Sequence, residues 1–134
     1  MDVELQPGNP NVVFAWMNRI ERKPWTIISG SREGGFYKST DGGETWTRKQ
    51  ATGLPTELIG KGNIAVTAAN PQRLYALVEA LPGGGLYRSE NAGESWQLVN
   101  STPGLITRPF YYTSLNADPT NADVIYGGAE TLYK

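Results

Sequence analysis

The octapeptide Ser39-Thr40-Asp41-Gly42-Gly43-Glu44-Thr45-Trp46 decides the fold, because a second version of it follows fifty positions later. That second version is Ser89-Glu90-Asn91-Ala92-Gly93-Glu94-Ser95-Trp96. The residues before each copy also repeat, since Gly35-Phe36-Tyr37-Lys38 corresponds to Gly85-Leu86-Tyr87-Arg88. A repeat of this length indicates a chain built from copies of one structural unit. We call the two octapeptides the first box and the second box.

A shorter landmark opens each unit. Asn9-Pro10, Asn70-Pro71 and Asp118-Pro119 each stand a few residues before an apolar run. The first unit carries an insertion, because 23 positions separate Phe14 from Tyr37 whereas 12 separate Tyr75 from Tyr87. The insertion lies in one connection, which we expect to be a long loop over 19–34.

Alternating apolar and polar residues between turn signals predict short strands and no long helix. The sequence therefore predicts an all-β fold: a β-propeller segment of about two and a half to three four-stranded antiparallel blades, with the boxes as hairpins. We expect a single domain over 1–134, with blade 1 at about 1–50, blade 2 at about 60–100 and a partial blade 3 at about 110–134. The expected strands are 3–7, 12–18, 35–39 and 45–50, then 64–68, 74–80, 85–89 and 95–100, then 111–118, 124–127 and 131–134.

Composition removes several classes of function. The chain has 12 Lys and Arg against 13 Asp and Glu, so it lacks the basic excess typical of nucleic-acid binding. It has no Cys and no His, which excludes disulfides, thiol nucleophiles and His-based catalytic triads. No apolar run approaches the roughly 20 residues of a membrane span, and the start does not resemble a signal peptide. The sequence predicts no cofactor, no nucleic-acid partner and no membrane insertion.

The box residues suit a hydrogen-bonded hairpin turn. We expect Asp41 to accept bonds from backbone N–H groups two residues on, and Asn91 to do the same without a charge. Ala92 replaces Gly42, which predicts a negative φ there, whereas Gly43 and Gly93 predict a left-handed residue. The tryptophans should pack over the turn or on the adjacent blade. The alternative, a calcium site at Asp41 and Glu44, lacks the oxygen spacing of a calcium loop. The structural residues are Ser39, Asp41, Gly43, Thr45, Trp46, Ser89, Asn91, Gly93, Ser95 and Trp96.

On these motifs the chain resembles the BNR/Asp-box repeat β-propellers, a sialidase-like superfamily that also contains xyloglucan-cleaving glycosidases and sortilin-type receptors. The stretches at 22–30, from Arg22-Lys23-Pro24-Trp25, and at 108–113, from Arg108-Pro109-Phe110-Tyr111-Tyr112, look like the sortilin-like members. The resemblance implies that the boxes lie opposite the binding face, and that this face recognises a protein or peptide.

Strand alternation gives the same partition, because it places the long connections expected over 19–34, 51–63 and 101–110 together on one face. Long loops on a rigid scaffold are where binding residues concentrate. This long-connection face supplies cations and aromatic rings suited to a sugar, a carboxylate or an acidic peptide. An alternative for Trp25 and Tyr111 is that their rings anchor long loops to the blades. The candidate ligand-binding residues are Arg22, Trp25, Lys61, Arg108, Tyr111 and Tyr112.

A glycosidase needs two carboxylates across the scissile bond. Glu21, Glu33, Glu57, Glu79 and Glu130 come from separate parts of that face, and their spacing does not mark a pair. The sequence therefore predicts a non-catalytic binding module for a protein, peptide or glycan ligand. The alternative is a fragment of a sialidase- or xyloglucanase-like glycoside hydrolase. Either way, we expect self-association or packing against the remaining blades of a larger propeller.

Overall fold

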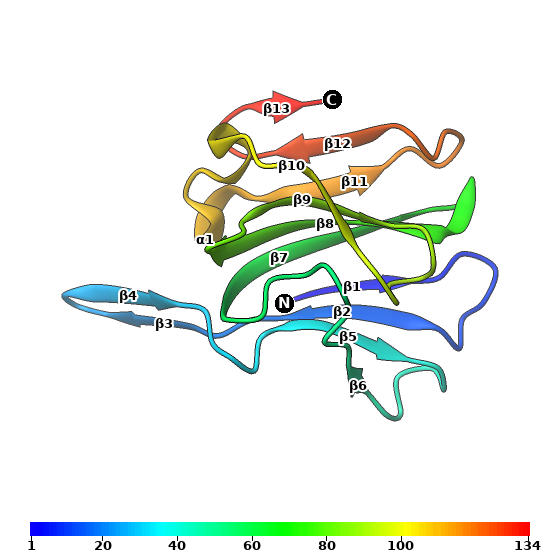
Figure 1. Ribbon diagram of the computed structural model, residues 1–134, viewed down its shortest axis with the longest axis horizontal. Coiled ribbons are helices and arrows are strands. Elements are labelled where there is room, and N and C mark those ends of the chain that lie inside the picture. The colour runs from blue at the N-terminus through cyan, green and yellow to red at the C-terminus, as the bar shows by residue number, and fades with distance from the viewer.

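The computed structural model describes residues 1–134 apart from the side chain of Phe110, and it confirms the all-β prediction. Three antiparallel sheets stack face to face, and each sheet corresponds to one blade (Figure 1). Blade 1 has the strand order β1 (Asp2–Leu5), β2 (Val13–Met17), β5 (Gly35–Ser39), β6 (Thr47–Arg48). Blade 2 has the order β7 (Leu58–Thr67), β8 (Asn70–Leu81), β9 (Gly85–Ser89), β10 (Gln97–Asn100), and blade 3 contains β11 (Ser114–Ala117), β12 (Ile125–Gly128), β13 (Leu132–Tyr133).

Strand β8 is buried on both faces, which explains its continuous apolar run. Successive side chains of a strand point to opposite faces, so Leu74, Ala76 and Val78 join the core between blades 1 and 2. Tyr75 and Leu77 join a second core between blades 2 and 3. The middle blade is therefore held by apolar packing on either side.

Strand β7 is longer than the sequence predicted. Its first half, from Leu58, consists of residues that were expected in a loop over 51–63. Gly60 and Gly62 interrupt the apolar pattern, but both lie against Trp16, and close packing requires a glycine at position 62. A Cβ at Gly62 would lie 2.3 Å from Cε2 of Trp16, whose side chain is completely buried. The indole Nε1–H of Trp16 donates to the carbonyl of Gly60 at 3.1 Å. The glycines thus mark a tryptophan packed against a strand, and the prediction of a loop was wrong.

The insertion in the first unit is also more ordered than a loop. It forms a two-stranded hairpin of β3 (Ile20–Lys23) and β4 (Thr26–Ser29), which projects beyond the stacked sheets (Figure 1). Its base is joined to β7 by two backbone hydrogen bonds between Ser31 and Ile59, of 3.0 and 3.3 Å.

The first strand of blade 3 begins three residues later than predicted. Tyr111 and Tyr112 were expected in a strand over 111–118, but they belong to the single-turn helix α1 (Pro109–Tyr112), which follows the 3-10 helix η1 (Pro103–Ile106). Pro109 occupies the first helical position, where its missing N–H costs nothing. Within the described part of the chain, no helix is long and apolar enough to cross a membrane.

The connections sort onto two opposite edges of the stack, as strand alternation requires. The short turns and both boxes lie at one edge, at the right in Figure 1. The hairpin, η1 and α1 lie at the other, together with the turn at 82–84. The first edge we call the box face, and the second is the long-connection face.

Candidate functional site

The first box is closed by its own side chains. Asp41 accepts the backbone N–H of Thr45 at 2.9 and 3.1 Å, and the Thr45 hydroxyl donates to Asp41 Oδ2 at 2.5 Å. The Ser39 hydroxyl donates to Asp41 Oδ1 at 2.7 Å and accepts the N–H of Gly43 at 2.9 Å. The Thr45 hydroxyl, the Thr45 amide and the Ser39 hydroxyl hold the pKa of Asp41 well below its usual range. Both carboxylate oxygens are thus occupied within the turn.

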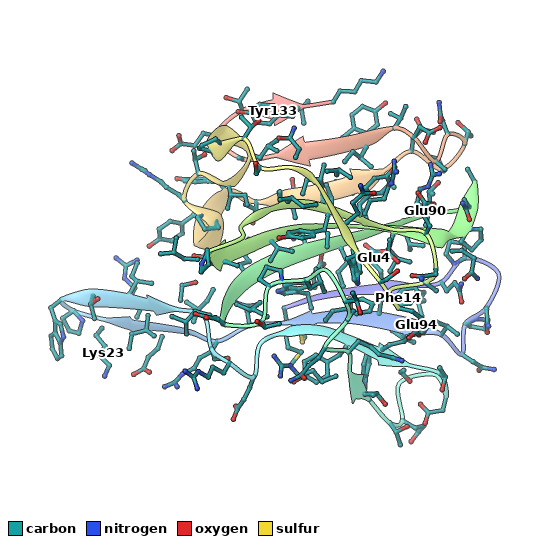
Figure 2. All side chains as sticks on the ribbon, viewed as in Figure 1. Glu4, Phe14, Lys23, Glu90, Glu94 and Tyr133 are labelled. Carbon is teal, nitrogen blue, oxygen red and sulfur yellow. The ribbon has the colours of Figure 1, made fainter. Side chains whose placement is uncertain are left out.

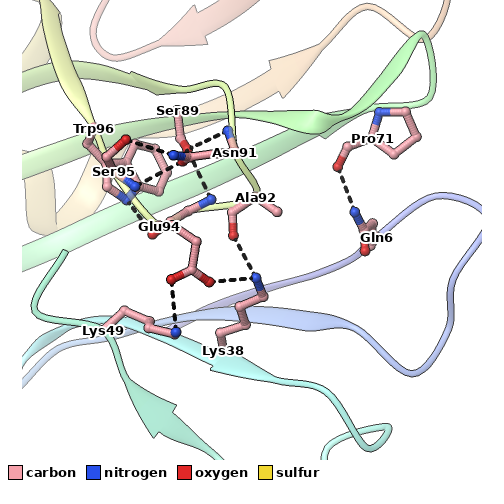
Figure 3. Close-up of polar contacts among 11 residues, drawn as sticks. Gln6, Lys38, Lys49, Pro71, Ser89, Asn91, Ala92, Glu94, Ser95 and Trp96 are labelled. Atoms are coloured by element: carbon pink, nitrogen blue, oxygen red, sulfur yellow. Dashed lines mark hydrogen bonds and ion pairs between the residues drawn. The ribbon is translucent and has the colours of Figure 1, made fainter. Parts of the chain in front are cut away.

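The second box makes the same turn without a charge (Figure 3). Asn91 Oδ1 accepts the N–H of Ser95 at 2.9 Å, and Asn91 Nδ2 donates to the Ser95 hydroxyl at 2.9 Å. The hydroxyl at this position therefore donates in the first box and accepts in the second. Ser89 accepts the N–H of Gly93 at 3.0 Å, and the Trp96 indole donates to the Gly93 carbonyl at 3.2 Å.

Two details of the predicted box geometry were wrong. The Asp and Asn oxygens reach the N–H four residues on rather than two. Ala92 has a φ of 54°, close to the 76° of Gly42, so this position is left-handed in both boxes. Alanine tolerates that conformation at a cost of about 1 kcal/mol. Gly43 and Gly93 are left-handed as predicted, with φ of 97° and 85°.

The long-connection face joins parts of the chain that are far apart in sequence. The Arg22 guanidinium of the hairpin donates a hydrogen bond to the hydroxyl of Tyr111 in α1. The rings of Tyr111 and Tyr112 lie 5.9 Å apart at 54°, and both residues are about half exposed. The structure therefore brings Arg22, Tyr111 and Tyr112 together.

Trp25 stands apart from this group. It lies in the two-residue turn of the hairpin and is 80% exposed, so its ring does not anchor the connection. Figure 2 shows the neighbouring Lys23 at the far end of the hairpin, away from the sheets. Trp25 remains available to a ligand, but at a distance from the stack.

Two predicted cations have structural partners. Lys61 lies within β7 rather than in a loop, and its Nζ donates to the carbonyl of Thr113 at 3.3 Å. Arg108 pairs with Glu130 at 3.4 Å and remains largely exposed. Arg108 also has a φ of 46°, which turns the chain from η1 into α1.

A groove of about 450 Å³ runs between the end of β8 and the η1–α1 segment. It extends from Glu79 past the turn at 82–84 to Pro109, the first residue of α1. Glu79 Oε2 accepts the Ser29 hydroxyl and the Lys61 backbone N–H, both at 2.8 Å. Among the described side chains, no hydrogen bond is formed to its other oxygen, Oε1, and Glu79 lines the groove. The sequence placed Glu79 among the acids of this face but gave it no binding role, because nothing in it reveals that Ser29 meets the end of β8.

The other carboxylates of the long-connection face do not line the groove. Glu21 pairs with Arg19 at 2.9 Å and with Lys23 at 3.3 Å, and Glu130 pairs with Arg108. In the described part of the chain, no three Asp or Glu residues gather in a way that would hold a metal ion.

Comparisons with known proteins identify the fold. No family model and no curated protein matches the chain. Among solved structures, it is similar to the GH74 xyloglucanase from Xanthomonas campestris, with a TM-score of 0.58 and 22% identity over 94% of the chain. It is equally similar to an ancestral GH74 enzyme, with a TM-score of 0.58 and 20% identity over 94%. The chain spans only 15% and 16% of the length of these two proteins. At this level of identity the matches establish the fold, and both of these neighbours are GH74 proteins rather than sortilin-type receptors.

Proposed function

We propose that the chain is a segment of a glycoside hydrolase-like propeller, and that its long-connection face binds a polysaccharide of the xyloglucan class. One observation carries the proposal: the Arg22–Tyr111–Tyr112 group shares this face with a groove that reaches α1 at Pro109, in a chain that folds like part of a GH74 xyloglucanase. The sequence resemblance alone pointed to a protein or peptide ligand.

The chemistry of the face suits a sugar chain. The faces of a pyranose ring carry C–H groups that pack against exposed aromatic rings such as those of Tyr111 and Tyr112. Sugar hydroxyls need acceptors and donors, which Glu79 Oε1 and the polar residues Ser101 and Thr102 supply along the groove. Exposed aromatic side chains gathered on a loop face are typical of a binding surface.

The proposal assigns binding, rather than bond cleavage, to this chain alone. Hydrolysis requires an acid and a second carboxylate on either side of the scissile bond. Glu21 and Glu130 are neutralised by cations outside the groove, and only Glu79 lines it. Any hydrolytic activity would then belong to a larger propeller that adds the second carboxylate.

Calorimetric titration with a xyloglucan oligosaccharide tests the proposal. We expect Tyr112→Ala to weaken binding about three- to tenfold, the value of one aromatic contact. Trp46→Ala is the matched control, because Trp46 is similarly exposed but lies in the first box. Equal loss of affinity in both variants, or no binding by the unmodified chain, would refute the proposal.

A further inference from the structure

The groove on the long-connection face contains a single charge. Among the described residues that line it, Glu79 is the only one with an ionisable side chain. Ser101 and Thr102 add hydroxyl groups, and the remaining lining consists of glycine, proline and aliphatic residues. A ligand in this groove therefore meets one negative charge and, from the lining itself, no positive charge.

The carboxylate of Glu79 is held in place by two other segments of the chain. Ser29, in the hairpin, donates its hydroxyl to Glu79 Oε2 at 2.8 Å, and the backbone N–H of Lys61 in β7 donates to the same oxygen at 2.8 Å. Gly60 provides the space for this arrangement, since a Cβ there would lie 2.3 Å from Oε2. The fold thus fixes the position of the negative charge before any ligand binds.

Both groups that hold Glu79 are neutral, so its charge is not cancelled within the chain. Among the described residues, Glu79 forms no ion pair. Two cations of the same face have other partners: Lys61 Nζ donates to the carbonyl of Thr113, and Arg108 pairs with Glu130. Glu79 differs in this respect from Glu130, whose charge is paired.

We infer that Glu79 makes the groove selective for neutral sugars over sugars that carry carboxylates or other anionic groups. A sugar hydroxyl can donate to a carboxylate, and a hydrogen bond to a charged acceptor is roughly twice as strong as one between neutral groups. An ionised carboxylate on the ligand has no proton to donate and is repelled by the like charge. Specificity of this kind comes from penalising the wrong ligand as well as from binding the right one.

This inference rests on the proposed polysaccharide site and assigns to one residue the choice of ligand charge. The cations and aromatic rings of the sequence suited a sugar, a carboxylate or an acidic peptide equally well. The charge of the groove separates these ligands, because only the neutral sugar avoids repulsion by Glu79.

A matched pair of ligands tests the selectivity. One is a neutral xyloglucan oligosaccharide, and the other is the same oligosaccharide after oxidation of its primary alcohols to carboxylates. Calorimetric titration at about 0.01 M salt, where the Debye length is about 30 Å, allows a charge anywhere along the groove to interact with Glu79. We expect the unmodified chain to bind the oxidised form at least about tenfold more weakly than the neutral form. The difference should shrink at about 1 M salt, where the Debye length is about 3 Å.

Two variants assign the effect to Glu79. Glu79→Gln removes the charge and keeps a side-chain oxygen that can accept the Ser29 hydroxyl. We expect it to bind the oxidised form more tightly than the unmodified chain does, so that the difference between the ligands falls below about threefold. Glu33→Gln is the matched control, because Glu33 is an exposed residue of the same face that does not line the groove. This variant should keep the full difference.

The outcomes distinguish this inference from the proposed function. Equal affinity of the unmodified chain for the two ligands would overturn the selectivity and leave the polysaccharide site standing. A difference that both Glu79→Gln and 1 M salt leave unchanged would do the same. Binding of neither ligand would refute the polysaccharide site and the selectivity together.

Discussion

At the residue scale, the two boxes show that one turn can be closed by two different polar pairs. Asp with Thr and Asn with Ser satisfy the same backbone N–H, and the hydroxyl reverses its role as the carboxylate becomes an amide. The charge of Asp41 is therefore not required for the turn. It does, however, couple the turn to pH.

We expect Asp41→Asn to reduce the acid sensitivity of the fold. The pKa of Asp41 is lowered on folding, so its stabilisation is present above the unfolded pKa of about 4 and is lost as the pH falls below it. Asp118 and Glu94, whose pKa values are also lowered, contribute equally to both proteins. Urea unfolding between pH 7 and about 2 should show a smaller loss of stability for the variant.

The reverse substitution is the control. Asn91→Asp should add acid sensitivity, because Ser95 can donate its hydroxyl to the new carboxylate as Thr45 does in the first box. Identical pH profiles for all three proteins would show that the box carboxylate is not stabilised by these bonds.

The box residues could be predicted from the sequence, but their conformation only in part. The repeat identified Ser39, Asp41 and Gly43 because the second box preserves their chemistry. The positive φ of Ala92 could not be predicted from the residue type, because the hydrogen bonds around Ala92 offset the free-energy cost of a left-handed alanine. Ala92 donates to the Gln72 carbonyl at 2.8 Å and its own carbonyl accepts from Lys38.

At the scale of elements, the glycines of β7 set how closely blades 1 and 2 approach. Trp16 fills the space that a side chain at Gly62 would occupy. A sequence pattern treats glycine as a break, because the partner that needs the space is 46 residues away. The hairpin of β3 and β4 could not be predicted for the same reason, because its base is hydrogen-bonded to Ile59, which is distant in the sequence.

We expect Gly62→Ala to destabilise the fold by about 1 to 3 kcal/mol, the usual cost of overpacking a core. Gly127→Ala in β12 is the matched control, because a Cβ there meets nothing within 4 Å. Urea unfolding of both variants measures the difference. Equal stability of the two would mean that Trp16 does not pack against Gly62.

At the scale of the whole molecule, the fold assigns different roles to its surfaces. The box face is closed by turns that satisfy their own polar groups, and the flanks are apolar surfaces shaped for another blade. The long-connection face combines a groove with exposed aromatic rings. The sequence predicted which loops share this face. It could not predict the contact of Arg22 with Tyr111, 89 residues away, or the groove beside Glu79.

The proposed polysaccharide site lies on the long-connection face of this propeller segment, and it can be tested directly. The most direct measurement is a nuclear magnetic resonance titration of the ¹⁵N-labelled chain with a xyloglucan oligosaccharide. Binding at the long-connection face should shift amide signals at 20–29, 79–84 and 101–113 and leave the signals of the two boxes unchanged. Shifts confined to the boxes or the blade flanks, or no shifts at saturating oligosaccharide, would contradict it.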